Sequence, residues 1–443
     1  MNDIGNQVCY LLNNDDQTAV VGYSSSAKGD ILIPKFVEVE SIEYTIIGIQ
    51  NQAFINNNSI HSVSFADDSE VQFIGQNVFC NSSIQSFSIP ASLKQIPEGW
   101  CCDVRKLTKL SVSPSNPNFE YYDNKILISK RDNEEIIIFA NRNIREIVIP
   151  SKVTRIGEFS FSDCFKLLSI QFSNDPQIRS ISKNAFLYSS LNEFFIPESV
   201  VEIEEGWCHE TRKLVNLHIS QNNENFSYLE KKILISKNKN KFVLFARRDI
   251  QNALIPSDIK KIGNCAFEHC HCLSSFRFEN HPLIEEIGVR SFLSCWFLND
   301  LHFIPKGVKK IGEYAFYSCK KLGYLCFEPG NEIKKFNSNS FGWCFNLFSI
   351  TSIPESLVEI DTRSFLSCVS LVSLEFLGED IKLVSETFNN CTHLSIISLP
   401  DAQLVTIKMF VFTRCSNNLT LFVHHNAAIV QIEESYRWFM CPS

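Results

Sequence analysis

Short stretches of the chain alternate apolar and polar residues, and the pattern is clear in residues 167–172. There Ile170 and Phe172 alternate with Ser169 and Gln171, and residues 371–376 and 394–399 repeat the arrangement. A period of two is typical of a β-strand with one buried face. A proline often follows, and because it cannot donate to a strand ladder it marks the end of the strand. We therefore predict many short, half-buried strands.

Most of these strands are preceded by one motif, Ile-Gly-x-x-small-Phe-x-x-Cys-x-x-Leu, which we call the cassette. It is clearest at 156–167, 262–273 and 311–322. Its Phe position recurs from residue 54 to residue 412 at intervals of 22 to 25 residues, except for two steps of 60 and 59 residues. Such a period is typical of solenoids, in which each unit buries its apolar face against the next copy. The Phe and Cys positions are three residues apart, which predicts that they share one face of a single helical turn.

We predict a leucine-rich repeat solenoid, a β-rich α/β superhelix with a parallel sheet on one face and short helical turns opposite. Thirteen stacked cassettes would supply a continuous core. The predicted organisation is an amino-terminal cap with the first strands at 1–48, the solenoid at 49–420 and a carboxy-terminal cap at 421–443.

The two long steps contain matching insertions, at about 118–140 and 225–246. In each insertion, two β-branched apolar runs flank four polar residues, which predicts a β-hairpin. The match extends along the chain at an offset of 106–107 residues, so a block of about four repeat lengths is duplicated. Because the apolar runs need burial, we expect Phe139 and Phe245 to be buried and the turns at 131–134 and 238–241 to project into solvent.

Composition excludes several classes of protein. The chain has 41 Lys and Arg against 49 Asp and Glu, a net charge of −8, whereas a protein that binds nucleic acid carries a basic stripe. Hydrophobic residues make up 44% of the chain, which is enough for a packed core. No apolar run approaches the ~20 residues of a membrane span, and the first residues lack the features of a secretory signal peptide, which favours a cytoplasmic protein.

The chain has 17 cysteines, and eight of them occupy the cassette position. In one interpretation they form a ladder of small buried hydrophobic residues, a role that suits reduced cysteine. In the other they form a disulfide framework, but adjacent disulfides on every coil would strain a parallel stack. We expect the reduced ladder. The eight positions are Cys164, Cys270, Cys295, Cys319, Cys344, Cys368, Cys391 and Cys415.

Motifs for catalysis or cofactor binding are absent from the sequence. The densest group of metal-ligand types is His-Cys-His-Cys at 269–272, with Cys265 upstream, and structural zinc sites usually space their paired ligands more widely. We find no phosphate-binding loop, dinucleotide fingerprint, zinc-protease motif or nucleophile elbow. We therefore predict no metal, no cofactor and no enzymatic activity. An enzyme with its site in the insertions is the remote alternative.

The cassette with its strand-ending proline resembles the BspA-type leucine-rich repeats, which are abundant in oral bacteria and in trichomonad and Entamoeba proteins. The resemblance runs from about Ile31 to about Val423. It implies a surface antigen or adhesin that binds proteins and mediates cell–cell recognition, and it implies a location at the cell surface.

The outward strand positions are where a protein partner, or a glycan, would bind. Most of them are small and polar, but a set between residues 195 and 324 is larger, and Tyr and Arg are favoured at binding hot spots. These residues also fit scattered surface positions without a partner, since lone exposed apolar residues are common. An intracellular scaffold with the same fold is the alternative function. The candidate partner-binding residues are Phe195, His218, Leu254, Arg277, His302 and Tyr324.

Overall fold

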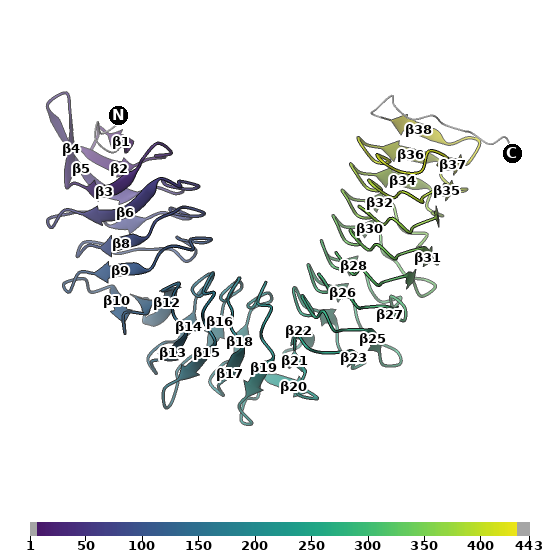
Figure 1. The fold of residues 1–443 in the computed structure, drawn as a ribbon, viewed down its shortest axis with the longest axis horizontal. Helices are drawn as coiled ribbons and strands as arrows, with labels where there is room; N and C mark the ends of the chain where they lie inside the picture. Colours follow the sequence, from purple (N-terminus) through teal and green to yellow (C-terminus); the bar gives the residue numbers. More distant parts are fainter. Residues whose placement is uncertain (1–6, 432–443) are drawn as a thin grey trace. The chain divides into compact units, whose positions relative to one another are not determined.

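The computed structural model describes residues 7–431, and the chain divides into two compact units, Met1–Asn223 (unit 1) and Glu224–Ser443 (unit 2). Every regular element in residues 7–431 is a β-strand. Each unit is a stack of coils, a coil being one turn of the solenoid, and the strands of successive coils lie side by side like rungs (Figure 1).

The strands predicted from the alternating pattern form the first row. All their pairings are parallel, which confirms the predicted stacking of cassettes. In unit 1 they are β3 (Gly29–Ile33), β6 (Ile60–Phe65), β8 (Ser86–Ile89), β9 (Lys109–Val112), β13 (Glu146–Ile149), β15 (Ser169–Phe172), β17 (Glu193–Ile196) and β19 (Asn216–Ile219). In unit 2 they are β23 (Asn252–Ile255), β25 (Ser275–Phe278), β27 (Asp300–Leu301), β29 (Tyr324–Cys326), β31 (Ser349–Thr351), β33 (Ser373–Glu375), β35 (Ile396–Leu399) and β37 (Thr420–Val423).

Alternation decides which side chains of the first row enter the core. Ile170 and Phe376 are buried and Ser373 is exposed, as expected. Phe172 was expected to be buried, but it is only half-buried. It is the last residue of β15, and its ring lies edge-on to that of Phe194, with 6.0 Å between the ring centroids.

A second row of short parallel strands lies on the opposite side of each coil, where helical turns were expected. Except for β38, these strands end on the apolar residue that opens the cassette. In unit 1 they are β7 (Phe73–Ile74), β14 (Arg155–Ile156), β16 (Ser180–Ile181) and β18 (Glu202–Ile203). In unit 2 they are β24 (Lys261–Ile262), β26 (Glu286–Ile287), β28 (Lys310–Ile311), β30 (Lys335–Phe336), β32 (Glu359–Ile360), β34 (Asp380–Leu383), β36 (Leu404–Ile407) and β38 (Ala428–Gln431).

The expected helical turns do not occur anywhere in residues 7–431, and the backbone of the cassette explains why. Tyr314 and Ser318 both have positive φ, 55° and 62°, and such left-handed residues interrupt a right-handed helix after each short turn. Every second amide group then bonds to the next coil, as where the N–H of Phe316 donates to the carbonyl of Ser340 at 2.8 Å. The amides between them bond within the turn, as where the N–H of Tyr317 donates to the carbonyl of Tyr314 at 3.1 Å, so the backbone groups are paired without a continuous helix.

The cassette Phe residues form a stacked aromatic column in the core of each unit. In unit 2 the ring of Phe316 lies 5.0 Å from that of Phe292 and 5.5 Å from that of Phe341, each pair within 3° of parallel. The cassette cysteines form a second column beside it. The thiol of Cys344 donates to the carbonyl of Phe316 at 3.2 Å, and the same bond from each coil to the preceding one recurs along unit 2. Burial raises the pKa of Cys344 to about 12.

The amino-terminal strands are arranged differently from the regular coils. β1 (Tyr10–Asn13) pairs antiparallel with β2 (Thr18–Val21), which in turn pairs parallel with β5 (Ile42–Ile49). The other partners of β5 are β4 (Phe36–Val39), which is antiparallel to it, and β7, which is parallel. The predicted carboxy-terminal cap at 421–443 continues beyond residue 431, outside the described residues.

Each insertion is an antiparallel meander with one strand more than the predicted hairpin. In unit 1 it comprises β10 (Phe119–Tyr122), β11 (Ile126–Arg131) and β12 (Glu134–Ala140), and in unit 2 β20 (Phe226–Leu229), β21 (Ile233–Ser236) and β22 (Phe242–Ala246). The last strand of each takes a place in the second row, β12 beside β14 and β22 beside β24. Phe139 and Phe245 are buried and the turns at 131–134 and 238–241 are exposed, which confirms the expected burial.

A buried arginine holds the coils on either side of the first insertion together. The guanidinium of Arg142 donates to the carbonyls of Val104 and Cys101, before the insertion, and of Ser160, after it. It also lies over the ring of Phe139, 4.8 Å from the centroid. The first-row sheet is interrupted at the insertion, between β9 and β13, and Arg142 links the backbone on the two sides of this break.

Candidate binding surface

The first-row strands present one surface to solvent, which we call the strand face. Inward residues such as Phe194 and Ile196 of β17 are buried, while the residues between them point outward. None of the six residues predicted to bind a partner is buried. Alternation therefore placed each of them on the predicted side of its coil.

Phe195 and His218 lie next to each other in unit 1. They are register partners in the parallel pair β17–β19, and Phe195 is 42% exposed. The Nε2 atom of His218 lies 4.0 Å from Oε1 of Glu193, which is two residues before Phe195 in β17. An exposed aromatic ring therefore stands beside an imidazole that pairs with a carboxylate when protonated.

Leu254 and Arg277 lie next to each other in unit 2, as register partners in β23 and β25. Leu254 is 53% exposed. Nε of Arg277 donates to Oδ2 of Asp300 at 3.1 Å, Nη2 donates to the same oxygen, and the hydroxyl of Ser275 adds a third bond at 3.0 Å. The Arg277 guanidinium lowers the pKa of Asp300, so this carboxylate stays charged. The pair fixes the direction of an exposed guanidinium.

His302 and Tyr324 follow on the next coils of unit 2. His302 is exposed, and its ring lies 5.0 Å from that of Phe303. Tyr324 is 42% exposed, and its hydroxyl lies 3.2 Å from Oγ1 of Thr351 on the neighbouring strand. Leu254, Arg277, His302 and Tyr324 thus occupy successive coils of one unit.

The structure divides the six predicted residues between the two units. Phe195 and His218 belong to unit 1, and the other four belong to unit 2. The strands of the second insertion, β20 to β22, lie between the two sets along the chain. Each set is therefore considered as a surface of its own unit.

A second surface group, built around the exposed Trp296, was missed by the sequence reasoning, which considered only strand positions. It lies on the cassette turns of unit 2. The rings of His271 and Trp296 stack at 3.9 Å, and Nζ of Lys320 lies 4.5 Å from the centroid of the Trp296 ring. All three follow the cassette Cys directly, so aligning this position across the cassettes would have shown that Trp296 stands beside His271 and Lys320.

The run His-Cys-His-Cys at 269–272 does not assemble as a set of ligands. The thiol of Cys270 lies in the core and donates to the carbonyl of Arg247 at 3.5 Å, while Cys272 is exposed. The ring of His271 lies on Trp296, and its Nδ1 is 2.8 Å from the carbonyl oxygen of Ser294. Neighbours in this run point to different sides of the coil.

Within residues 7–431, no helical segment has the length and hydropathy that crossing a bilayer requires.

Comparisons with known proteins find several similar solved structures. Structures similar to this chain include a leucine-rich cell surface protein from Faecalibacterium prausnitzii, at 21% identity over 90% of this chain and 94% of that one, with a TM-score of 0.46. A leucine-rich repeat protein from Eubacterium ventriosum is 19% identical over 93% of each chain, with a TM-score of 0.49. The pneumococcal vaccine antigen PcpA is 14% identical over 98% of each chain, with a TM-score of 0.38. A comparison with curated proteins finds no significant match.

A family model, the BspA type leucine rich repeat region, matches residues 36–128, 135–234, 238–351 and 334–436. These segments contain the cassettes and most strands of both rows, and the two gaps between them, at 129–134 and 235–237, fall inside the insertions. The chain therefore belongs to the BspA-type leucine-rich repeat family.

Proposed function

We propose that this chain is a non-enzymatic, protein-binding solenoid that works as a surface antigen or adhesin and recognises its partner through the strand face. The observation that carries the proposal is the set Leu254, Arg277, His302 and Tyr324 on successive coils of unit 2. Large side chains replace there the small polar ones typical of the face. Tyr and Arg are the residue types that most often supply binding energy at protein interfaces.

The contacts of these residues favour binding. Asp300 already orients the guanidinium of Arg277, so little side-chain freedom is lost when a partner docks. Tyr324 is a rigid side chain whose hydroxyl faces Thr351 and whose ring is available for apolar contact. The set fits a protein surface with an apolar pocket and an acceptor for the guanidinium. In unit 1, Phe195 and His218 are a second, smaller contact of the same kind.

The arrangement of the coils also favours binding over catalysis. An active site needs converging groups in a pocket, whereas within each unit the candidate residues lie one to a coil along the strand face. The insertions, where a hidden site was considered, place runs such as Ile126–Ile128 and Ile136–Ala140 in the core. These two features favour a binding surface over an active site.

Binding to a panel of purified extracellular and cell-surface proteins tests the proposal, with the intact chain immobilised. The triple variant Leu254→Ser, Arg277→Ser, Tyr324→Ser should weaken binding of a captured partner by about 10-fold or more. The matched control Leu283→Ser, Arg363→Ser, Phe297→Ser changes exposed residues of unit 2 away from the strand face and should bind normally. Equal affinity of the two variants would refute the proposal. Binding that survives protease treatment of the partner but not glycan removal would assign the face to a glycan.

The thiol column favours a second candidate, an intracellular scaffold with the same fold. Each of its thiols donates a proton to a carbonyl, as Cys344 does to Phe316, and this bond requires the reduced form. Surface biotinylation of intact cells separates the two candidates. Labelling of the chain supports the antigen or adhesin, and exclusion of the reagent until lysis supports the scaffold.

A further inference from the structure

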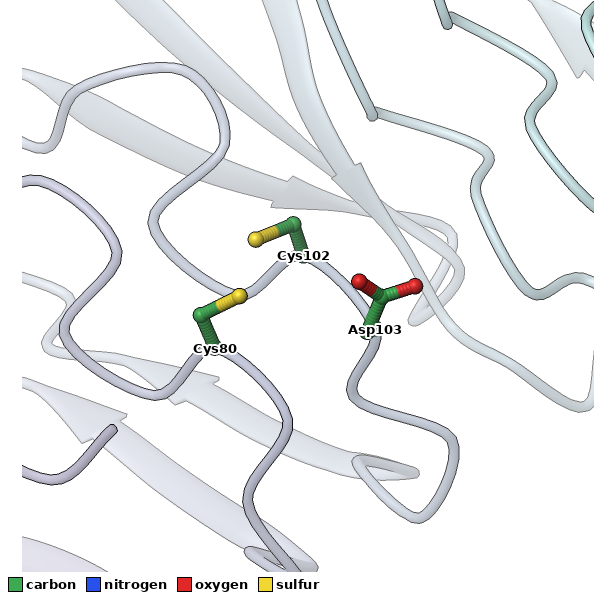
Figure 2. A group of neighbouring side chains, drawn as sticks. All are labelled: Cys80, Cys102 and Asp103. Carbon is green, nitrogen blue, oxygen red and sulfur yellow. The ribbon is translucent and has the colours of Figure 1, made fainter. Parts of the chain in front are cut away.

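Two cysteines outside the cassette positions face each other in unit 1. Each follows directly after the cassette Phe position of its coil, Cys80 after Phe79 and Cys102 after Cys101. The coils are neighbours, because the N–H of Asn81 donates to the carbonyl of Cys102 at 3.1 Å. Figure 2 shows both sulfur atoms turned toward the space between the two turns, with the carboxylate of Asp103 beside Cys102.

The potential ligand atoms of this group lie close enough to share one ion. The sulfur atoms of Cys80 and Cys102 and a carboxylate oxygen of Asp103 all lie within 4.8 Å of one another. In a tetrahedral zinc site with bonds of about 2.0–2.3 Å, the ligand atoms are roughly 3.3–3.8 Å apart. Small side-chain rotations therefore suffice to close the group around an ion. The thiol of Cys102 also lies 3.5 Å from Oδ1 of Asn77, a further oxygen donor.

Burial and charge also suit a cation. Cys102 is 7% exposed, while Cys80 and Asp103 are half-buried, so an ion can enter from solvent and then be partly shielded. A bound cation displaces the protons of the two thiols, because the thiolate is the form that binds metals. Two thiolates and a carboxylate supply the negative charge that a divalent cation neutralises.

The duplicated block shows that the fold does not require these residues. At an offset of 107 residues, Leu187 replaces Cys80 and His209 replaces Cys102, while the cassette residues are kept. Leu187 is buried in a coil of the same form. Cys80 and Cys102 also lie outside the cassette thiol column of the core. A role in packing alone therefore does not account for two facing thiols.

We propose that Cys80, Cys102 and Asp103 bind a thiolate-preferring divalent cation of the zinc class, with Asn77 or water as the fourth ligand. Two sulfur donors and a harder oxygen are a ligand set suited to zinc. The two thiols could alternatively form a disulfide, but a disulfide gives no role to the carboxylate that lies with them. The bound ion clamps two coils of unit 1 just before the first insertion.

Titration of the reduced intact chain with Co²⁺ under anaerobic conditions tests the site. Wild type should bind one ion per chain at the site, show a thiolate-to-cobalt charge-transfer band, lose the band on addition of Zn²⁺ and melt at a higher temperature with Zn²⁺. Cys80→Leu, the residue found in the duplicated block, should abolish the band and the Zn²⁺-dependent stabilisation. Asp103→Asn should weaken binding by about 10- to 100-fold or more, because outer-shell changes alone cost that much.

The control Cys272→Ser removes an exposed cysteine of unit 2 and should leave the band unchanged. If Cys80→Leu does not fold, Asp103→Asn carries the test on its own. The proposal is overturned if reduced wild type shows no thiolate band, or if both variants bind as wild type does. It is also overturned if the chain isolated anaerobically holds a Cys80–Cys102 disulfide and takes up no ion after reduction.

Discussion

Replacing Arg142 with methionine removes the buried cation that joins the coils around the first insertion. Arg142 is 3% exposed, and methionine keeps much of its stem while removing all its N–H donors. Nε donates to the carbonyl of Val104 at 3.0 Å, and the two other nitrogens reach the carbonyls of Ala140, Ser160 and Cys101 at 3.3 to 3.4 Å. The substitution therefore takes a donor from four backbone carbonyls at once.

Two losses and one gain set the size of the effect. A buried polar group left without its partner costs about 1–3 kcal/mol, and four carbonyls are affected, although a carbonyl's second lone pair softens the loss at each. The lost contact with the Phe139 ring adds roughly 0.5–2 kcal/mol. Against these losses, removing the charge also removes the cost of keeping it out of water, which is several kcal/mol. From the balance of these terms we expect a net loss of about 3–5 kcal/mol in the stability of unit 1.

Urea unfolding followed by tryptophan fluorescence measures this loss. Trp100 lies 5.9 Å from Phe139 and reports on the junction, while Trp296 and Trp343 report on unit 2 as an internal control. Hydrogen exchange should show faster opening at β12 and β14, which pair across the end of the insertion. Arg142→Lys keeps the charge but offers donors from a single atom, so we expect it to restore only part of the stability.

An unfolding midpoint at or above that of wild type would refute this reasoning. It would mean that the cost of burying the guanidinium exceeds what its four carbonyl contacts return. A shift in the signal of unit 2 as large as that of unit 1 would show instead that the effect is not local to the junction.

Three further outcomes test the packing. Phe316→Ala should destabilise unit 2 by about 3–5 kcal/mol because a buried ring leaves a cavity, whereas Tyr324→Ala on the strand face should have a much smaller effect; equal melting shifts would mean that the two faces are reversed. Limited trypsinolysis should cut first in the exposed turn at 237–241, and early cleavage at Lys309 would show that the regular coils open more easily than the insertion. At least six of the eight cassette cysteines should react with a thiol reagent only after denaturation, and finding them in disulfides by mass spectrometry would contradict the reduced column.

The sequence predicted the features that repeat in phase. The alternation around Ile170 and Leu374 specified strands with one buried side, and the constant spacing of the cassette Phe specified parallel stacking. The second row could not be predicted, because a strand of two residues such as Lys310–Ile311 contains no period. The left-handed turns were missed because Tyr314 is not a residue type that signals positive φ. Bonds between coils decide that backbone, and they exist only after stacking.

The candidate site, like the fold, was predictable from the sequence only in part. Alternation indicated that Arg277 points outward, but its bond to Asp300 depends on the register between strands, which a single sequence does not give. Arg142 lies between two asparagines and is typical of an exposed loop by sequence. It is buried because carbonyls from both sides of the insertion meet around it, and only the folded chain brings them together.

The column of cassette thiols has a consequence for the order of events when the chain is made. Along unit 2, each sulfur gives its proton to a Phe carbonyl of the coil before it, and an oxidised sulfur has no proton to give. Each coil must therefore close while its cysteine is still reduced. In an oxidising compartment, the closing of each coil then competes with the oxidation of its cysteine. A chain that meets an oxidant early loses this bond at each oxidised coil, whereas a chain that folds first buries its thiols and is protected from the same oxidant afterwards.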